Sequence, residues 1–269
     1  MDLWLRHPFL ILAAMGIAAA PALGAAEGPA AGLDVIFLAN EGVYLSGGGR
    51  AVILDGCVRE PYYGYGAVPD DVWAKLLRRE APFERLDAVL VSHAHLDHFQ
   101  VEACRELLLA RPEARFVVHR EVAALLAADW PRWNEVAPRV TEVAPADGKP
   151  ERYSGDGVEV ELLRLPHGAA RTLPENLAHI VTLGGRTAIH VGDAEASAAA
   201  LERSGLTGRT VDVGLLPYWY WSGDQWAAAR AALSGRLGTV ALHRPPAEAP
   251  ATGPGAPYAF QKALERLRF

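Results

Sequence analysis

Cysteine is scarce in this chain, which has only Cys57 and Cys104 among its 269 residues. Cys57 follows the end of an expected strand and Cys104 lies in an expected helix, and a disulfide needs a geometry that a sequence does not specify. Export would permit a bridge, but we predict two separate thiols, and neither stands where a ligand is needed. Repeats and linkers are absent too, which argues against a division into several domains.

Clusters of lysine and arginine are also absent. The chain carries 26 basic and 32 acidic residues, so its formal net charge is −6. Because phosphate contacts need a basic surface, this balance argues against a nucleic acid as partner. We expect a small-molecule substrate instead, and the sequence leaves the oligomeric state open.

The first residues have the pattern of a secretory signal peptide. Arg6 precedes an apolar run at residues 9–20, and small residues follow as far as Ala26. This order predicts a cleaved signal at residues 1–26, and hence an exported protein that is periplasmic or secreted. Residues 27–269 then form a single mature domain, whose net charge is still −6 because one residue of each sign is removed.

An uncleaved membrane anchor is the alternative, since residues 9–26 approach the length of a membrane span. Pro21 and the many alanines of this run favour removal. We therefore expect no stable membrane insertion once the signal has been cleaved.

Three histidines and an aspartate lie within six positions at the end of an apolar run. Residues 86–91 form a short, continuous run that is typical of a buried strand, and the motif His-Ala-His-Leu-Asp-His follows at residues 93–98. In an extended segment, residues two apart point the same way, so His93 and His95 can face one metal ion together. Asp97 and His98 then turn toward another position. A polar, histidine-rich loop is the alternative interpretation, but this spacing is typical of metal sites.

The motif alone holds too many ligands for one tetrahedral zinc ion that also keeps a water. Later apolar strands are each followed by a strong ligand type, and these residues are His167, Asp193 and His243. We therefore predict two divalent metal ions. The first is bound by His93, His95 and His167, the second by Asp97, His98 and His243, and Asp193 bridges the two. Zinc fits these ligands best, and iron or manganese would also be accepted.

Three other histidines are predicted to be structural. If residues 187–193 are extended, Asp193 shares a face with Val191 while His190 points the other way. His179 lies in the middle of a strand, and His119 ends a strand without a second candidate beside it.

The order of elements indicates the fold class. The pattern predicts strands at 33–38, 42–46, 51–55, 86–91, 115–119, 140–143, 158–163, 177–183, 187–191, 211–216 and 239–242, and helices at 70–80, 99–110, 121–129, 194–203, 225–233 and 258–267. Each half begins with antiparallel strands and ends in strand–helix units. We therefore predict an α/β fold with two sheets packed face to face and helices outside, a four-layer αββα sandwich.

Two aromatic stretches are candidates for the walls of a substrate pocket. They comprise Tyr62, Tyr63 and Tyr65 in one loop, and Tyr218, Trp219, Tyr220 and Trp221 after a later strand. Their richness would suit an apolar or ring-bearing substrate. The alternative is that they are packing residues at the bases of loops, and the sequence does not decide between the two.

With these ligands in this order, the chain resembles the metallo-β-lactamase-fold superfamily over nearly all of residues 27–269. The resemblance implies the αββα fold and a two-metal hydrolase site. It also implies that Asp55, at the end of the opening strands, steadies the ligand loop from behind. It does not specify the substrate.

Departures from the patterns of known superfamily branches narrow the choice of branch for this chain. The secreted β-lactamases of the superfamily lack an aspartate at the place of Asp193. Hydroxyacylglutathione hydrolases have glycines where this chain has Phe99 and Gln100, and the tRNA-processing nucleases need a basic patch. The opening residues 37–43 and the compact length are similar to the lactonase and phosphodiesterase-like members.

The ligand set and the resemblance together predict a metal-dependent hydrolase. A metal-bridging hydroxide would attack an ester, lactone or phosphodiester, and Asp97 and Asp193 would pass the proton to the leaving group. Two alternatives stay open: an iron-dependent oxidoreductase with the same fold, and a non-catalytic metal-binding module, which the complete ligand set disfavours.

Overall fold

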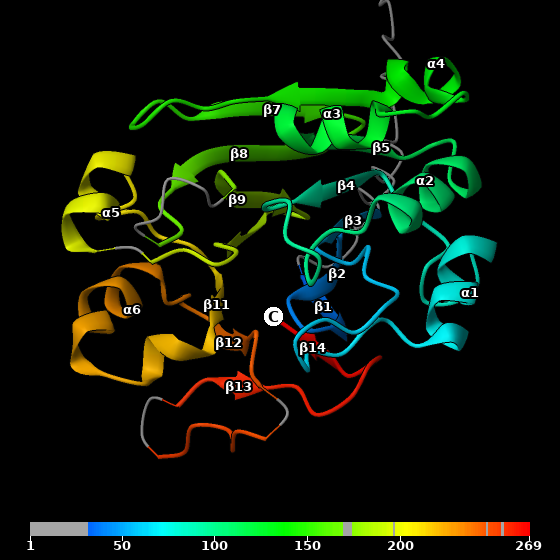
Figure 1. Ribbon diagram of the computed structural model, residues 1–269. Coiled ribbons are helices and arrows are strands. Elements are labelled where there is room, and N and C mark those ends of the chain that lie inside the picture. The colour runs from blue at the N-terminus through cyan, green and yellow to red at the C-terminus, as the bar shows by residue number, and fades with distance from the viewer. Residues whose placement is uncertain (1–31, 169–173, 196, 246, 254–255) are drawn as a thin grey trace, which may run out of the picture.

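The computed structural model describes residues 32–168, 174–195, 197–245, 247–253 and 256–269 (Figure 1). The predicted signal peptide, residues 1–26, lies outside these residues and stays a prediction. None of the helices in the described part of the chain has the length and apolar composition needed to cross a membrane.

Two seven-stranded sheets form the centre of the molecule. The first has the order β14-β1-β2-β3-β4-β5-β6, with β1 (Asp34–Ala39), β2 (Gly42–Gly47), β3 (Arg50–Leu54), β4 (Ala88–Val91), β5 (Arg115–His119), β6 (Val140–Val143) and β14 (Arg266–Arg268). The second has the order β13-β12-β11-β10-β9-β8-β7, with β7 (Glu151–Gly155), β8 (Val158–Leu165), β9 (Asn176–Leu183), β10 (Arg186–His190), β11 (Val213–Pro217), β12 (Gly238–Leu242) and β13 (Tyr258–Ala259).

Each sheet changes from antiparallel to parallel pairing part-way across. Strands β1, β2 and β3 pair antiparallel, as the glycine turn between β2 and β3 requires, and β3 to β6 then pair in parallel. In the second sheet, β7 to β10 are antiparallel and β10 to β13 are parallel. Parallel neighbours need crossover connections, which here carry the helices.

Helices cover the two outer faces (Figure 1). The helices are α1 (Asp70–Arg78), α2 (Val101–Ala110), α3 (Arg120–Ala127), α4 (Trp133–Val136), α5 (Ala198–Ser204) and α6 (Ala227–Leu233). Helices α1, α2 and α3 pack on the outer face of the first sheet, and α5 and α6 pack on that of the second. The four-layer αββα sandwich is therefore confirmed.

Strand β3 shows why the central strands are apolar on both faces. Val52 and Leu54 face the core between the sheets, whereas Ile53 faces the helical layer. All three side chains have 0% exposure. A strand covered on both sides has no polar face, so its sequence is a continuous apolar run rather than an alternating one.

The C-terminal helix predicted at residues 258–267 is wrong. Residues Tyr258–Ala259 form β13 beside β12, and Arg266–Arg268 form β14 beside β1. Both strands add backbone hydrogen bonds to an open sheet edge, a stabilisation that local helical periodicity does not reveal. Arg266 also bonds Asp34 through its Nε atom at 2.9 Å.

Strand β7 was missed because it lies at the edge of its sheet and is not apolar. Its five residues alternate between half-buried and exposed, and its composition resembles that of a loop. Cys57 and Cys104 are free and buried, in agreement with the prediction of two separate thiols.

Candidate metal centre

The predicted ligands follow the carboxyl ends of four strands. The motif at residues 93–98 follows β4, and His167, Asp193 and His243 follow β8, β10 and β12, respectively. Strands β8, β10 and β12 run in the same direction within the second sheet. Their loops therefore leave that sheet at one edge, where they meet the loop after β4 from the first sheet.

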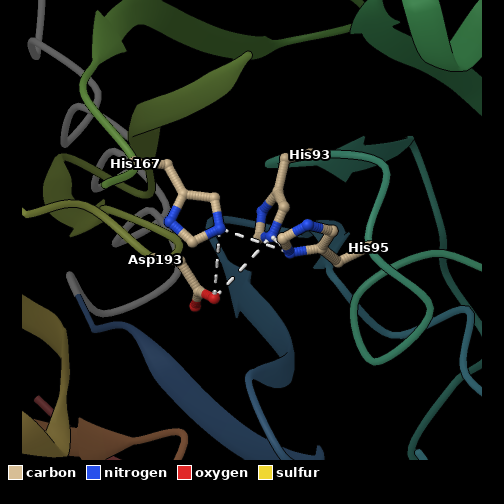
Figure 2. A group of neighbouring side chains, drawn as sticks. All are labelled: His93, His95, His167 and Asp193. Carbon is tan, nitrogen blue, oxygen red and sulfur yellow. Dashed lines mark hydrogen bonds and ion pairs between the residues drawn. The ribbon is translucent and has the colours of Figure 1, made fainter. Parts of the chain in front are cut away.

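The first group of side chains contains His93, His95, His167 and Asp193, whose ligand atoms all lie within 4.8 Å of one another. Figure 2 shows the three rings and the carboxylate pointing toward a common space. Nδ1 of His95 lies 3.0 Å from Nε2 of His93 and 3.2 Å from Nε2 of His167. Oδ2 of Asp193 lies 3.7 Å from both Nε2 atoms.

The second group contains Asp97, His98 and His243. Oδ2 of Asp97 lies 3.7 Å from Nε2 of His98 and 3.2 Å from Nε2 of His243. Oδ1 of Asp193 lies 3.2 Å and 3.3 Å from the same two ring nitrogens. Asp193 therefore stands between the groups, with Oδ2 toward the first and Oδ1 toward the second.

These distances suit metal ligands better than hydrogen bonds. Nε2 of His98, Nε2 of His243 and Oδ1 of Asp193 have no hydrogen-bond partner among the described residues, although the two nitrogens lie 3.2 Å and 3.3 Å from that oxygen. Ligands about 2.0–2.1 Å from a tetrahedral zinc ion are roughly 3.3–3.4 Å from one another. Ligand atoms whose lone pairs point at one common ion, rather than at each other, would have such spacings and would lack hydrogen bonds. The residues therefore fit a metal ion in each group.

Asp55 supports the ligand loop from behind. Its carboxylate accepts hydrogen bonds from the backbone N–H of Ser92 at 2.7 Å and from the Ser92 hydroxyl at 2.5 Å. Oδ2 lies 2.9 Å from Nδ1 of His98, so that ring keeps its proton on Nδ1 and turns Nε2 toward the second group. Burial acts to raise the pKa of Asp55, but the hydrogen bond and charge of His98 hold that pKa well below its usual value.

Asn176 and Gly192 set the position of Asp193. The side chain of Asn176 donates to the carbonyl oxygen of Val191 at 3.0 Å and accepts from the Asp193 N–H at 3.2 Å. Gly192 has a φ of +54°, and a Cβ atom there would lie 2.4 Å from Oδ1 of Asn176. Only glycine fits this turn without displacing the loop.

Comparison with known proteins agrees with this geometry. A family model described as "Beta-lactamase superfamily domain" matches residues 66–249, which is more than half of the chain and includes every predicted ligand. The chain belongs to the beta-lactamase superfamily. A search of curated protein sequences found no match.

Solved structures show the same fold. Igni18, a metallo hydrolase from the archaeon Ignicoccus hospitalis, superposes with a TM-score of 0.57 at 16% identity, over 88% of this chain and 98% of its own. Human tRNase Z, short form, superposes with a TM-score of 0.53 at 13% identity, over 87% of this chain and 98% of its own. At these identities the likeness establishes the fold and not the substrate.

Several residues of this beta-lactamase superfamily member were missed from the sequence. Asn40 donates from Nδ2 to the Asp97 carbonyl oxygen at 3.1 Å, and Asn176 has the role described above. Glu41 is 1% exposed and contacts His190 beneath the second group. A glutamate and an asparagine in a turn between two buried strands were the available signal, but turns are often polar for other reasons.

The remaining histidines lie outside the two groups. Nε2 of His190 lies 3.1 Å from the Glu41 carbonyl oxygen. His179 lies opposite His190 in the β9–β10 ladder and is fully buried. His119 begins α3, where its Nδ1 accepts the N–H of Glu121 at 3.4 Å. Each of the three packs within the protein and belongs to neither predicted ligand set.

The aromatic stretches divide between the centre and the core. The rings of Tyr65 and Trp219 lie edge-on to His243, with centroids 4.2 Å and 5.3 Å away. The pKa of Tyr65 is raised to about 12, and burial is the largest cause of this shift. The phenol is therefore neutral at physiological pH. Tyr62 packs edge-on against Tyr63, which is 86% exposed.

Tyr220 packs inside the protein, which is the alternative that the sequence left open for this stretch. It has 0% exposure and donates from its hydroxyl to the Ala194 carbonyl oxygen at 2.9 Å. It stacks on Trp226 within the core beneath α6. Tyr218 and Trp221 line a separate hollow of about 190 Å³. The 3₁₀ turn at Tyr218–Trp221 has about three residues per turn, so its first and fourth side chains share one side while Tyr220 points in another direction.

A groove of about 260 Å³ opens beside the second group, along His243 and Asn40. Phe37 and Phe260, stacked with centroids 5.1 Å apart, form an apolar part of its wall. The groove beside the candidate metal centre is therefore mainly apolar, and two cationic side chains, Arg244 and Lys262, also line it.

Proposed function

We propose that the protein is a hydrolase of small esters, lactones or phosphodiesters that uses two divalent metal ions. The observation that carries this proposal is the position of Asp193, whose two carboxylate oxygens face two separate groups of ligands. Membership of a superfamily whose solved relatives include a metallo hydrolase supports it.

The ligands suit zinc best, because imidazole nitrogens dominate, and with the carboxylate oxygens present iron or manganese would also be held. When bound, two such ions would lower the pKa of a shared water and polarise a carbonyl or phosphoryl oxygen of the substrate.

Asp97 and Asp193 are the residues that we assign to proton transfer. Burial acts to raise the pKa of Asp97, but the imidazoles of His243 and His98, 3.2 Å and 3.7 Å from its Oδ2, keep that pKa below its usual value. The carboxylate is therefore ionised at neutral pH and can accept a proton from the attacking water and return it to the leaving group. Asn40 holds the same residue through its backbone carbonyl and, at 3.5 Å, through Oδ2.

The groove beside His243 supports a substrate with an apolar or ring-bearing part. Phe37 and Phe260 offer a stacked aromatic wall, and Tyr65 and Trp219 narrow the space over the His243 ring. Aromatic walls with a few polar groups are typical of small-molecule sites. We also propose that the protein acts after export, as the pattern of residues 1–26 predicts.

A substrate panel tests the proposal. Protein comprising residues 27–269 is loaded with zinc and assayed on matched aryl esters, lactones and phosphodiesters, with the Asp193→Ala variant as the control that lacks a ligand. Turnover of one class that disappears on chelation and returns with metal is expected. If no class is turned over and protein from the native host carries iron, the hydrolase assignment is wrong and an iron-dependent oxidoreductase takes its place.

A further inference from the structure

Glu41 is a buried carboxylate that the predicted site does not use. It lies in the turn between β1 and β2 and is 1% exposed. Within the described part of the chain it forms no ion pair with an arginine or lysine, and its Oε1 atom has no hydrogen-bond partner. A buried carboxylate oxygen without a partner is costly, so its presence calls for a function.

His190 fixes the orientation of this carboxylate. The N–H of Gly192 donates to Nδ1 of His190 at 3.2 Å, so the ring carries its proton on Nε2. Nε2 lies 3.1 Å from the carbonyl oxygen of Glu41 and 3.2 Å from its Oε2. Oε2 is therefore held by His190, and Oε1 is left for another partner.

The second ligand group lies next to this carboxylate. One oxygen of Glu41, a ring nitrogen of His98 and an oxygen of Asp193 all lie within 4.8 Å of one another. A second arrangement joins Glu41 with Asp55 and His190, but the Asp55 oxygens already accept from Ser92 and face His98. The partner that remains for Oε1 is on the side of His98 and Asp193.

We propose that Glu41 is a further ligand of the second metal ion, through Oε1. This inference rests on the two-metal centre proposed above. The second ion would then have three carboxylates, Asp97, Asp193 and Glu41, with two imidazoles, His98 and His243. The first ion would have three imidazoles and one carboxylate. His190 is a positioning residue that aims Glu41.

The two positions would consequently prefer different metals. Nitrogen-rich sites with four ligands suit zinc, whereas harder ions such as manganese and iron(II) favour more ligands and more carboxylate oxygens. The second position is therefore the one at which manganese or iron(II) competes best with zinc.

The test compares metal binding of metal-free wild type and Glu41→Gln. Glutamine keeps the size of the side chain and an oxygen that accepts from His190, but it removes the negative charge. Calorimetric titrations with zinc and with manganese should show two sites in the wild type. In the variant, the first zinc affinity should be unchanged and the second affinity weaker by about 10- to 100-fold, with manganese more affected than zinc. Visible spectra of the cobalt(II) form should report a lower coordination number at one position.

Glu161→Gln is the matched control, since it makes the same chemical change in a largely buried carboxylate that pairs with Arg152 on the second sheet. It should leave both affinities unchanged. Glu41→Asp keeps the charge but withdraws the oxygen by one methylene, and it should lose the second ion selectively even if the glutamine variant does not fold. If a folded Glu41 variant binds both metal ions with unchanged affinity, Glu41 is not a ligand, although the proposed two-metal centre would still stand. A wild type that binds only one ion would overturn the two-metal centre as well.

Discussion

The two ligand groups differ in how much of the protein stands behind them. In the first group, His93 is fully buried and contacts the Ser92 hydroxyl through Nδ1, but His95 and His167 are only half-buried. In the second group, His98 is fully buried and is held by Asp55, and the Asp97 backbone is held by Asn40. The first group is thus the more open, and the second is the more firmly supported.

The residues that support the second group come from the opening strands of the chain. Asn40, Glu41 and Asp55 all precede residue 66, at which the match to the superfamily model begins. The ligands themselves follow later strands. The opening strands therefore supply much of the support behind the second group, and the following experiments test that contrast.

The largest effect is expected for Asp193→Ala, because this carboxylate faces both groups. The variant should lose both ions, and turnover should fall by about 100- to 1,000-fold. Metal analysis by mass spectrometry together with activity measures both effects. Retention of two ions and full turnover by the variant would remove Asp193 from the centre.

Asp55→Asn should separate the groups. The substitution removes the charge that directly faces His98 Nδ1, whereas Asp55 reaches the first group only through Ser92 and His93. The second ion should therefore bind about 10- to 100-fold more weakly. The first ion should be affected less. Sequential zinc titration checks the order, and equal weakening of both ions would contradict the separate support described here.

Gly192→Ala should damage the loop that both groups share. The positive φ and the close approach of a Cβ atom to Asn176 predict a loss of roughly 1–3 kcal/mol in the free energy of unfolding. Urea denaturation of the metal-free protein measures this loss without any contribution from metal binding. Gly49→Ala is a useful comparison, since its Cβ atom would meet nothing within 4 Å although its φ is also positive. Equal stability losses would show that crowding against Asn176 is unimportant.

Trp219→Ala should alter substrate preference and leave metal content unchanged. The indole lies against His243 beside the second group, so its removal widens the space there. We expect the ratio of KM for aryl substrates to KM for alkyl substrates to change several-fold. Each lost apolar contact should cost about 1–3 kcal/mol of binding free energy or less. A parallel loss of metal would instead give Trp219 a structural role.

Asp87→Asn should change acid stability while leaving both groups intact. Burial acts to raise the pKa of Asp87, but hydrogen bonds from Arg85, the Ala51 N–H and Arg50 hold it below its usual value. Its pKa is lower in the folded state than in the unfolded state, so its contribution is present above the unfolded pKa and is lost as the pH falls through the folded one. The free energy of unfolding of the wild type should exceed that of the variant by about 1 kcal/mol at neutral pH. This difference should disappear in acid. A difference that persists in acid would point to lost packing.

Much of the fold could be predicted because strand ends and strand parity are local properties. The glycine turn between β2 and β3, the buried runs of β3 and β4, and the position of α1 after Pro69 all agree with the structure. The ligands could be proposed for the same reason, since each is the first strong ligand type after an apolar strand. Their binding of metal stays a prediction, although the geometry brings them together.

The sequence by itself determined the residue types, the alternation of buried strands with helices, and the order of His93 to His243 along the chain. The tertiary structure decided which polar groups meet: Glu41 and His190 are 149 positions apart, and Asn40 and Asp97 are 57 apart. It also decided that the C-terminal residues close the edges of both sheets. Such contacts depend on long-range packing, which no local periodicity encodes, and for that reason only the folded chain reveals which residues support the second ligand group.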